Sequence, residues 1–357
     1  QWGEVSQVVI DECHCVSEWG HDFRPAYLSL SRIVRDRTNR LGVSAPLIAL
    51  TGTASSIVLA DVKRELGVTE DAAVIRAKKL DRPEIELTCI RLGQREKHAQ
   101  LKKLVLDFVI NSTSQKDGML IFSRFIRGAE GVINITSELL GCVPQDGIRF
   151  YCGQAPDWKS FAAAQTTKKA SDISPKGAVN AAPVWALTSD GRLGAWEQVK
   201  SKVQRDFISG EKGSFPVLVA TTAFGMGIDK PSVRQVIHTM APQSPEAYYQ
   251  EVGRAGRDKL SSKAVLLFSD EDSEVTDKIL APSANIDVAR RAYLEHTAKN
   301  KFGGGDFIRT FFFHQNSFLG PEHECRHIVL VLGSIRKALT DGGSIIFQYK
   351  SSGGTVD

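Results

Sequence analysis

The sequence predicts an α/β fold with parallel sheets. Short, uninterrupted runs of β-forming residues recur at 8–10, 47–50, 118–124 and 217–220, and such runs are typical of strands that are buried on both faces, as in parallel sheets. Helical stretches separate several of these runs, and the one at 96–110 gathers its apolar residues on one face. Polar residues follow each run, at the carboxyl edge where open α/β sheets bind ligands.

Length and composition limit the class of protein. The chain has 357 residues, 42% of them hydrophobic, which suits a globular protein of about two or three domains. Six cysteines are scattered without a C-x-x-C pair, so neither a disulfide framework nor a four-cysteine zinc site is indicated. A net charge of +4 does not by itself require nucleic acid. Because no apolar run reaches membrane length and no secretory signal opens the chain, we expect no membrane partner and a cytoplasmic location, nucleoid-associated in a bacterium.

Two carboxylates follow the first strand run. Asp11 and Glu12 come directly after residues 8–10. A carboxylate at this edge can hold Mg²⁺, and a second one beside it can orient the water that attacks the γ-phosphate of ATP. We therefore expect Asp11 to bind Mg²⁺ and Glu12 to activate water. The alternative is a solvated turn, because a string as short as DECH also arises by chance.

An aromatic and cationic loop follows the acidic pair, within the segment VVIDECHCVSEWGHDFRPAY at 8–27. Rings offer stacking faces to bases and arginine offers charge to phosphate, so four residues are candidates for binding DNA: Trp19, His21, Phe23 and Arg24. The alternative places Trp19 and Phe23 in the domain core. The whole segment resembles motif II and the aromatic-rich loop of the RecQ family, within the superfamily 2 helicases. His14 belongs to this motif and is added to the expected nucleotide site.

Short polar segments follow two more of the predicted strands. TGTAS resembles the family's motif III, and we expect Thr51 and Thr53 to hydrogen-bond the acidic pair at the nucleotide site; the alternative is an ordinary strand-to-helix turn with a helix cap. GMLIFSR resembles motif IV, and we expect Ser123 and Arg124 to contact a phosphate of a DNA strand. An ordinary loop is the alternative there.

The segment FPVLVATTAFGMGIDKPSVRQVIH at 215–238 closely resembles motif V, whose role in the family is to couple the ATP cleft to the DNA backbone. Its glycines allow a close approach to phosphate. We expect Thr221 and Thr222 to contact DNA, and Gly227 and Asp229 to lie at the nucleotide. The alternative is a glycine loop of an unrelated α/β protein.

The segment SPEAYYQEVGRAGRD at 244–258 resembles motif VI. Ser-Pro starts a helix, and spacings of four and three residues put Gln250, Arg254 and Arg257 on one face, at or just past that helix. Two guanidinium groups there can stabilise the charge that develops on a transferring γ-phosphoryl group. The resemblance implies that they are arginine fingers supported by Gln250. A surface helix with salt-bridged arginines is the alternative.

The resemblance covers residues 1 to about 270 and implies two RecA-like parallel-sheet domains. We place the boundary at Pro83, so that residues 1–82 belong to the first domain and residues 83–270 form the second. No glycine-rich phosphate loop ending in Lys-Ser or Lys-Thr occurs in the sequence, so we expect the first domain to be incomplete.

Two stretches of the expected second domain carry lysines. Residues 155–194 are rich in Ala, Ser, Thr, Lys, Gly and Pro, and look like a surface insertion that is partly flexible. In the helical stretch at 96–110, Lys97, Lys102 and Lys103 lie off the apolar face. We expect both sets of lysines to be solvated, and contact with nucleic acid is the alternative.

Residues 271–357 are less informative and are expected to form a small, mostly helical segment. In the family, a zinc-binding segment and often a winged helix follow at this place. The chain offers only Cys325 near three histidines, namely His314, His323 and His327. A mixed site is chemically allowed, but this spacing matches no zinc finger or ribbon, so zinc is not assigned.

The resemblance implies an ATP-dependent DNA helicase that moves 3′ to 5′ on single-stranded DNA and unwinds duplex or forked DNA. Mg²⁺-ATP would lie between the acidic pair and the arginines, and the setting would be DNA repair, recombination or genome defence. We expect this chain alone to be inactive, because the phosphate-binding loop is absent from it. Two alternatives stay open: a DNA translocase of a DNA-modification or phage-defence system that does not unwind, and a catalytically inactive DNA-binding scaffold.

Overall fold

The structure is a computed structural model that describes most of residues 6–280. Apart from gaps of one or two residues, the described ranges are 6–16, 45–52, 56–76, 81–165, 182–209, 215–224, 229–269 and 273–280, with isolated positions within 30–36, 172–177 and 288–306. Chain contacts divide the protein into residues 1–310 and 311–357, and the second unit lies outside the described residues. In the described part of the chain, no helix is long and apolar enough to span a membrane.

A two-stranded parallel sheet carries the N-terminal part of the candidate site. Strand β1 (Val8–Ile10) pairs with β2 (Leu47–Ala49). β1 leads into a 3-10 turn, η1 (Cys13–Val16), against which helix α2 (Ser56–Leu66) packs. Six buried residues form the core of this sheet: Ile10, Cys13, Val16, Val58, Val62 and Leu66. Because the two strands run in the same direction, the residues that follow β1 and those that follow β2 meet at one edge.

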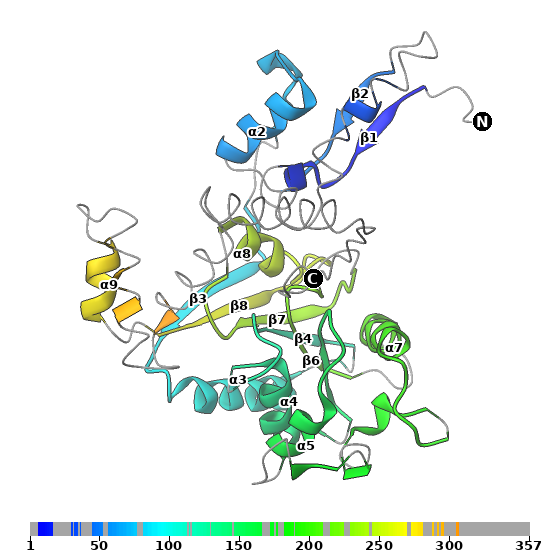
Figure 1. Ribbon diagram of the computed structural model, residues 1–357, viewed down its shortest axis with the longest axis vertical. Helices are drawn as coiled ribbons and strands as arrows, with labels where there is room; N and C mark the ends of the chain where they lie inside the picture. Colours follow the sequence, from blue (N-terminus) through cyan, green and yellow to red (C-terminus); the bar gives the residue numbers. More distant parts are fainter. Residues whose placement is uncertain are drawn as a thin grey trace, which may run out of the picture. The chain divides into compact units, whose positions relative to one another are not determined.

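A six-stranded sheet forms the main body of the described chain, with the strand order β3-β8-β7-β4-β6-β5. Its strands are β3 (Ile85–Arg91), β4 (Gly118–Phe122), β5 (Ile148–Tyr151), β6 (Val217–Ala220), β7 (Val233–His238) and β8 (Ser262–Phe268). Every adjacent pair is parallel, and Figure 1 shows β3, β8, β7, β4 and β6 side by side in this order. The carboxyl ends of all six strands therefore line one edge.

Helices connect the strands and cover the sheet. They are α3 (Lys97–Asn111), α4 (Val132–Leu139), α5 (Trp158–Ala164), α7 (Trp196–Ser209), α8 (Pro245–Val252) and α9 (Ser273–Leu280), with short 3-10 turns η2 (Asp71–Ala73), η3 (Leu140–Cys142) and η5 (Val184–Ala186). Helices α3 and α4 lie next to each other (Figure 1). All residues of β4, β5 and β6 are buried, as expected of strands covered on both faces. The expected parallel α/β fold is confirmed, and the helix expected at 96–110 corresponds to α3.

The aromatic residues of the 155–194 stretch belong to the core, so the expectation of a surface segment is wrong for them. Phe161 and Trp185 are buried, and their ring centroids lie 5.8 and 5.2 Å from that of Phe150 in β5. Trp158 and Trp196 add rings to the same cluster. The prediction rested on the polar composition of the stretch and did not take these few large side chains into account. Their rings pack against Phe150 and so attach the stretch to the sheet. Whether the stretch is an insertion relative to the family stays a prediction.

Lys97 is buried, so the expectation that it lies on a solvated face is also wrong. Its side chain is 2% exposed, and its Nζ lies 2.7 Å from both carboxylate oxygens of Asp306 and 2.8 Å from the carbonyl oxygen of Thr239. Asp306 in turn accepts a hydrogen bond from the amide of Ser269, at 2.9 Å. The cation is therefore paired with a carboxylate 209 positions further along the chain, which helix periodicity cannot reveal. Lys103 is exposed, as expected.

Candidate functional site

The acidic pair lies where β1 ends. Asp11 is exposed, and its Oδ1 accepts a hydrogen bond of 2.9 Å from the backbone amide of Glu12. Glu12 has a positive φ of 51°, a region that residues other than glycine rarely occupy. This backbone turn separates the strand from η1. Strained positions of this kind cluster at functional sites.

His14 joins three separate segments of the chain. The side chain is buried, at 5% exposure, in η1. Its Nδ1 lies 3.0 Å from Thr51 Oγ1, in the segment after β2, and 3.2 Å from Glu12 Oε2. Its Nε2 lies 3.3 Å from Gln250 Nε2, on helix α8. Thr51 is therefore linked to the acidic pair through the imidazole ring. A direct hydrogen bond from Thr51 to the two carboxylates stays a prediction.

The two arginines follow helix α8 rather than lying on it. α8 ends at Val252, so Gln250 is in its last turn, whereas Arg254 and Arg257 belong to the turns that come next. The expectation that all three residues lie on one helical face is therefore wrong for the arginines. From here on, residues 253–258 are called the arginine loop.

Arg254 is a partly buried cation. Burial and then the nearby charge of Arg257 lower its pKa, while the carboxylates of Glu251 and Glu12 act in the opposite direction. Its Nε has no hydrogen-bond partner among the described residues. Arg257 is more exposed, and its Nη1 lies 3.0 Å from Asp229 Oδ1. Because Arg254 lies close enough to Glu12 for their charges to interact, the acidic strand end and the arginine loop are neighbours.

A buried pair supports α8 from the sheet, and sequence reasoning did not identify it. His238 at the end of β7 places its Nε2 2.7 Å from Glu251 Oε2, and Phe122 stacks on the imidazole ring at 5.4 Å. Arg124 lies close to the same carboxylate, and burial lowers the pKa of its guanidinium to about 10. In the sequence, the one feature that could have drawn attention to this pair is that Glu251 directly follows Gln250.

The expected DNA-binding residues divide into three groups. Trp19, His21, Phe23 and Arg24 lie outside the described residues, as do Thr53 and Gly227 of the expected nucleotide site. The second group consists of the motif V threonines: Thr222 is exposed, whereas Thr221 is buried, at 7% exposure. Asp229, which was expected at the nucleotide, is also exposed.

The third group consists of the motif IV residues, which face inward. Ser123 is 2% exposed, its hydroxyl donates to the carbonyl oxygen of Glu130, and it accepts a hydrogen bond from the amide of Phe125 at 3.2 Å. Arg124 is partly buried beside Glu251. In this arrangement Ser123 organises its own loop, so the expectation that it offers its hydroxyl to a DNA phosphate does not match the geometry.

The residues present fit a magnesium ion that is shared with a nucleotide. Among the described residues, no group of three His, Cys, Asp or Glu side chains could hold a metal. Mg²⁺ in nucleotide sites needs only one or two carboxylates, because phosphate and water oxygens complete its shell. The exposed carboxylate of Asp11 at a strand end suits that role. The residues considered for zinc, with Cys325 at their centre, lie outside the described residues.

Comparison with known proteins adds an independent observation. Residues 181–259 match the family model "Helicase conserved C-terminal domain". Over 277 residues the chain is 34% identical to "ATP-dependent DNA helicase RecQ" of Pasteurella multocida, which covers 78% of this chain and 34% of that protein. It is 33% identical over 276 residues to "Probable ATP-dependent DNA helicase RecS" of Bacillus subtilis, with 77% and 44% covered.

A eukaryotic relative gives a similar result. The chain is 31% identical over 271 residues to "RecQ-like DNA helicase blm-1" of Caenorhabditis elegans, with 76% of this chain and 22% of that protein covered. The chain therefore spans between about a fifth and less than a half of the length of these three relatives.

Proposed function

The chain is a RecQ-like member of the superfamily 2 helicases with the expected RecA-like α/β fold, and from this premise we propose that the protein is an ATP-dependent DNA helicase of the RecQ type. The proposal includes hydrolysis of Mg²⁺-ATP, movement 3′ to 5′ along single-stranded DNA and unwinding of duplex or forked DNA. The names of the matched relatives support helicase activity. The domain boundaries at 82/83 and 270/271 are part of the same proposal.

One observation carries the catalytic part of the proposal. His14 contacts Thr51 on one side and Gln250 on the other, so the segment that holds Asp11 and Glu12 lies beside the segment that holds Arg254. A phosphoryl-transfer site needs a metal-binding carboxylate, a group that orients water, and cations for the developing charge. These three kinds of group come from segments about 240 positions apart in the sequence. The contact between His14 and Gln250 supports the proposal that they act together.

Each side chain then has a distinct task. Asp11 would hold Mg²⁺, which when bound supplies charge neutralisation at the phosphate oxygens. Glu12 orients the attacking water and receives its proton. Arg254 stabilises the negative charge that develops on the transferring phosphoryl group, and its partial burial strengthens that interaction because little water screens it. Arg257 contributes a second positive charge once it exchanges Asp229 for phosphate.

Gln250 and His14 connect this chemistry to DNA. The aromatic loop with Trp19 follows His14 by five positions, so a change in that loop on binding single-stranded DNA is transmitted to the imidazole over a short distance. Through His14, the same change reaches both the acidic pair and α8. We therefore expect Trp19→Ala to lower DNA stimulation of ATP hydrolysis more than basal hydrolysis. Equal losses in both rates would assign Trp19 to packing instead.

The central test is Glu12→Gln, measured in the whole protein as ATP turnover with and without single-stranded DNA. We expect turnover to fall by about 10²- to 10⁴-fold, the usual contribution of a positioned general base, while the affinity for DNA stays unchanged. Glu70→Gln, at an exposed carboxylate in the turn after α2, is the matched control and should hydrolyse ATP like the unmodified protein. Undiminished hydrolysis in Glu12→Gln would refute the assigned role.

Strand displacement separates the helicase from its two alternatives. Duplexes with a 3′ tail, a 5′ tail, a fork or blunt ends are mixed with the protein and ATP, and release of the strand is measured. We expect release from the 3′-tailed and forked duplexes. ATP consumption without release would favour a translocase, and DNA binding without ATP consumption would favour a scaffold. The same assay applied to residues 1–357 alone tests the expectation that this chain is inactive by itself.

A further inference from the structure

One arginine outside the helicase motifs contacts the arginine loop directly. Arg82 lies in the segment that leads from the first sheet into β3. Its Nη1 donates to the carbonyl oxygen of Gly253 at 3.3 Å, and its Nη2 donates to those of Ala255 and Gly256 at 3.0 and 3.1 Å. Three backbone carbonyls of one six-residue loop therefore converge on a single guanidinium group.

A carboxylate fixes the orientation of that guanidinium group. The Nε of Arg82 donates to Glu84 Oε1 at 2.5 Å, and only 10% of the Glu84 side chain is exposed. This hydrogen bond holds the pKa of Glu84 well below its usual range, at about 2. With Nε held by the carboxylate, the two outer nitrogens point at the loop. A lysine has one nitrogen at this place and cannot make the same set of contacts.

Arg82 lies at the carboxyl end of helix α8. The helix ends at Val252, and the carbonyls of Gly253 and Ala255 lie just beyond it, whereas the carbonyl of Gly256 also accepts a hydrogen bond from the amide of Lys259 at 2.9 Å. A cation there also interacts favourably with the helix dipole. Gly256 adopts a positive φ of 57°, and an added Cβ would lie 3.0 Å from the carbonyl oxygen of Leu260. The loop is thus tightly folded, and Arg82 adds hydrogen bonds to three of its carbonyl oxygens.

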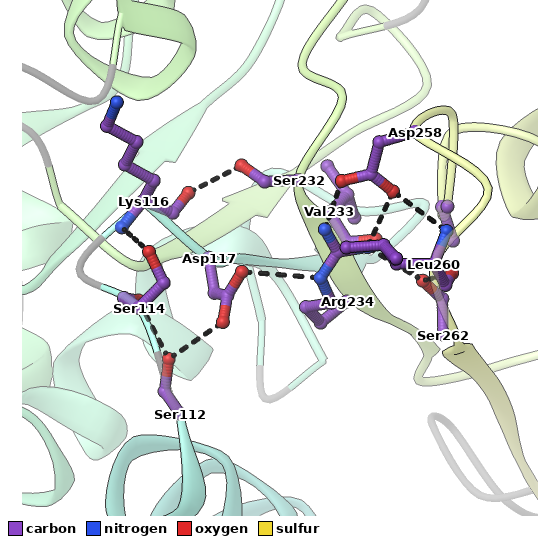
Figure 2. A network of polar contacts seen from close by, with 12 residues as sticks. Ser112, Ser114, Lys116, Asp117, Ser232, Val233, Arg234, Asp258, Leu260 and Ser262 are labelled. Atoms are coloured by element: carbon purple, nitrogen blue, oxygen red, sulfur yellow. Dashed lines mark hydrogen bonds and ion pairs between the residues drawn. The ribbon is translucent and has the colours of Figure 1, made fainter.

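The far end of the loop is held by a second arginine. Arg234 at the start of β7 forms a two-pronged ion pair with Asp258, one contact of which measures 2.9 Å, and its Nε lies 3.3 Å from Asp117 Oδ1. Figure 2 shows the guanidinium of Arg234 between these two carboxylates. Arg254 and Arg257 belong to the arginine loop, between its first residue, which contacts Arg82, and its last residue, which pairs with Arg234, and their positive charges repel each other. The contacts at both ends of the loop hold its backbone against this repulsion.

We propose that Arg82 is a positioning residue for Arg254 and Arg257: its grip on the carbonyls of Gly253, Ala255 and Gly256 sets the distance between the arginine loop and the reacting phosphoryl group. This inference rests on the proposed function. Because Arg82 lies in the segment that joins the two sheets, a movement of that segment is transmitted directly to the arginine loop. Arg82 itself touches no reacting atom.

The test compares the chemical step with nucleotide binding in the whole protein. For Arg82→Gln we expect the kcat of ATP hydrolysis to fall by about 10- to 100-fold, as for a displacement of about 1 Å of a catalytic group, with KM changed by less than about threefold. Affinity for ADP with aluminium fluoride, which mimics the transition state, should fall by the same factor as kcat. Affinity for ADP alone should stay unchanged. Arg82→Lys should also lower kcat, because lysine keeps the positive charge but lacks the several N–H donors of the guanidinium group.

Two comparisons separate positioning from a general structural role. Arg76→Gln removes an exposed arginine from the same linking region and should leave kcat unchanged. In a double-mutant cycle, Arg82→Gln should add little to the loss caused by Arg254→Ala, because both act on the same interaction. Additive losses, a kcat within about twofold of Arg76→Gln, or equal losses for ADP and the transition-state mimic would overturn the proposal.

Folding and the proposed function are controlled separately. If Arg82→Gln does not fold, as judged by circular dichroism, Glu84→Ala decides, because it keeps Arg82 and removes the side-chain oxygen that accepts from its Nε. A lower kcat with unchanged ADP affinity in Glu84→Ala supports the proposal, and an unchanged kcat overturns it. If the unmodified protein neither hydrolyses ATP nor binds the transition-state mimic, the proposed function fails instead, and protection of amides 253–258 from hydrogen exchange then tests the grip of Arg82 alone.

Discussion

The buried ion pair between Lys97 and Asp306 gives a large effect on stability that can be tested. The side chains are 2% and 0% exposed, and the Nζ lies 2.7 Å from both oxygens of the carboxylate. Lys97→Met keeps the length of the side chain but leaves the carboxylate of Asp306 buried without its cation. Such a loss costs about 3–5 kcal/mol of the free energy of unfolding, because the remaining charge is desolvated and uncompensated.

The measurement is unfolding by urea and by heat, followed by circular dichroism. For a folded body of this size, about 3–5 kcal/mol corresponds to a decrease in Tm of roughly 6 to 20 °C. Lys103→Met is the matched control on the same helix, since Lys103 is exposed, and should change stability by less than about 0.5 kcal/mol. A cost for Lys97→Met as small as that of the control would refute the reasoning.

A double variant separates the pair from its surroundings. Lys97→Met with Asp306→Leu removes both charges, and replacing a buried pair by apolar groups is often nearly neutral. We therefore expect the double variant to be more stable than Lys97→Met alone. The interaction free energy from this cycle should reach about 2–3 kcal/mol for residues in direct contact. The cycle also includes Asp306→Leu alone. If the double variant is less stable than both single variants, the attraction between the charges is not what stabilises this part of the fold.

Three further predictions concern the site and its support. His14→Ala should uncouple DNA binding from hydrolysis, so that added single-stranded DNA raises the ATPase rate less than in the unmodified protein; full stimulation would exclude a relay through the imidazole. Phe150→Ala should cost about 3–5 kcal/mol in urea unfolding, because it leaves a cavity among the rings of Trp158 and Trp185, and a cost below about 1 kcal/mol would show that the cluster can collapse around it. The pKa of Glu84 is about 2 in the fold against an ordinary 4.5, so its contribution to stability is present above about pH 4.5 and is lost as the pH falls towards 2; stability measured against pH for Glu84→Gln should lack that part of the acid-induced loss.

The local pattern of the sequence was sufficient for the elements that carry the site. Buried parallel strands read as continuous apolar runs, so β4 and β6 were identified from residue type alone. β1 and β2 are strands as expected, but the expectation that they are buried is wrong, because Val9 is 52% and Ile48 41% exposed. Because parallel strands end at the same edge, the polar residues after β1 and β2 were expected to meet, and His14 does meet Thr51. The contact of His14 with Gln250, on a helix beside the other sheet, does not follow from strand ends. The order of several motifs along the chain gave the family.

Contacts between distant parts of the chain were not accessible in this way. Lys97 was expected in solvent because helix periodicity does not show a partner at position 306, and Ser123 was expected to face a phosphate because a strand end does not show which loop folds back over it. The helical spacing of the arginines failed for a related reason. Helix α8 ends at Val252, and the loop that follows is shaped by partners from other segments.

The parallel α/β fold, the order of the motifs and the chemical type of each candidate group were therefore predictable, because they depend on residue types and on spacings within one segment. The link from His14 to α8, and the contacts of Arg82 and Arg234 with the two ends of the arginine loop, became evident only in the folded protein. They were not predictable because a hydrogen bond or ion pair depends on distance in space. Folding brings together guanidinium, carboxylate and carbonyl groups whose separation along the chain carries no trace of that distance.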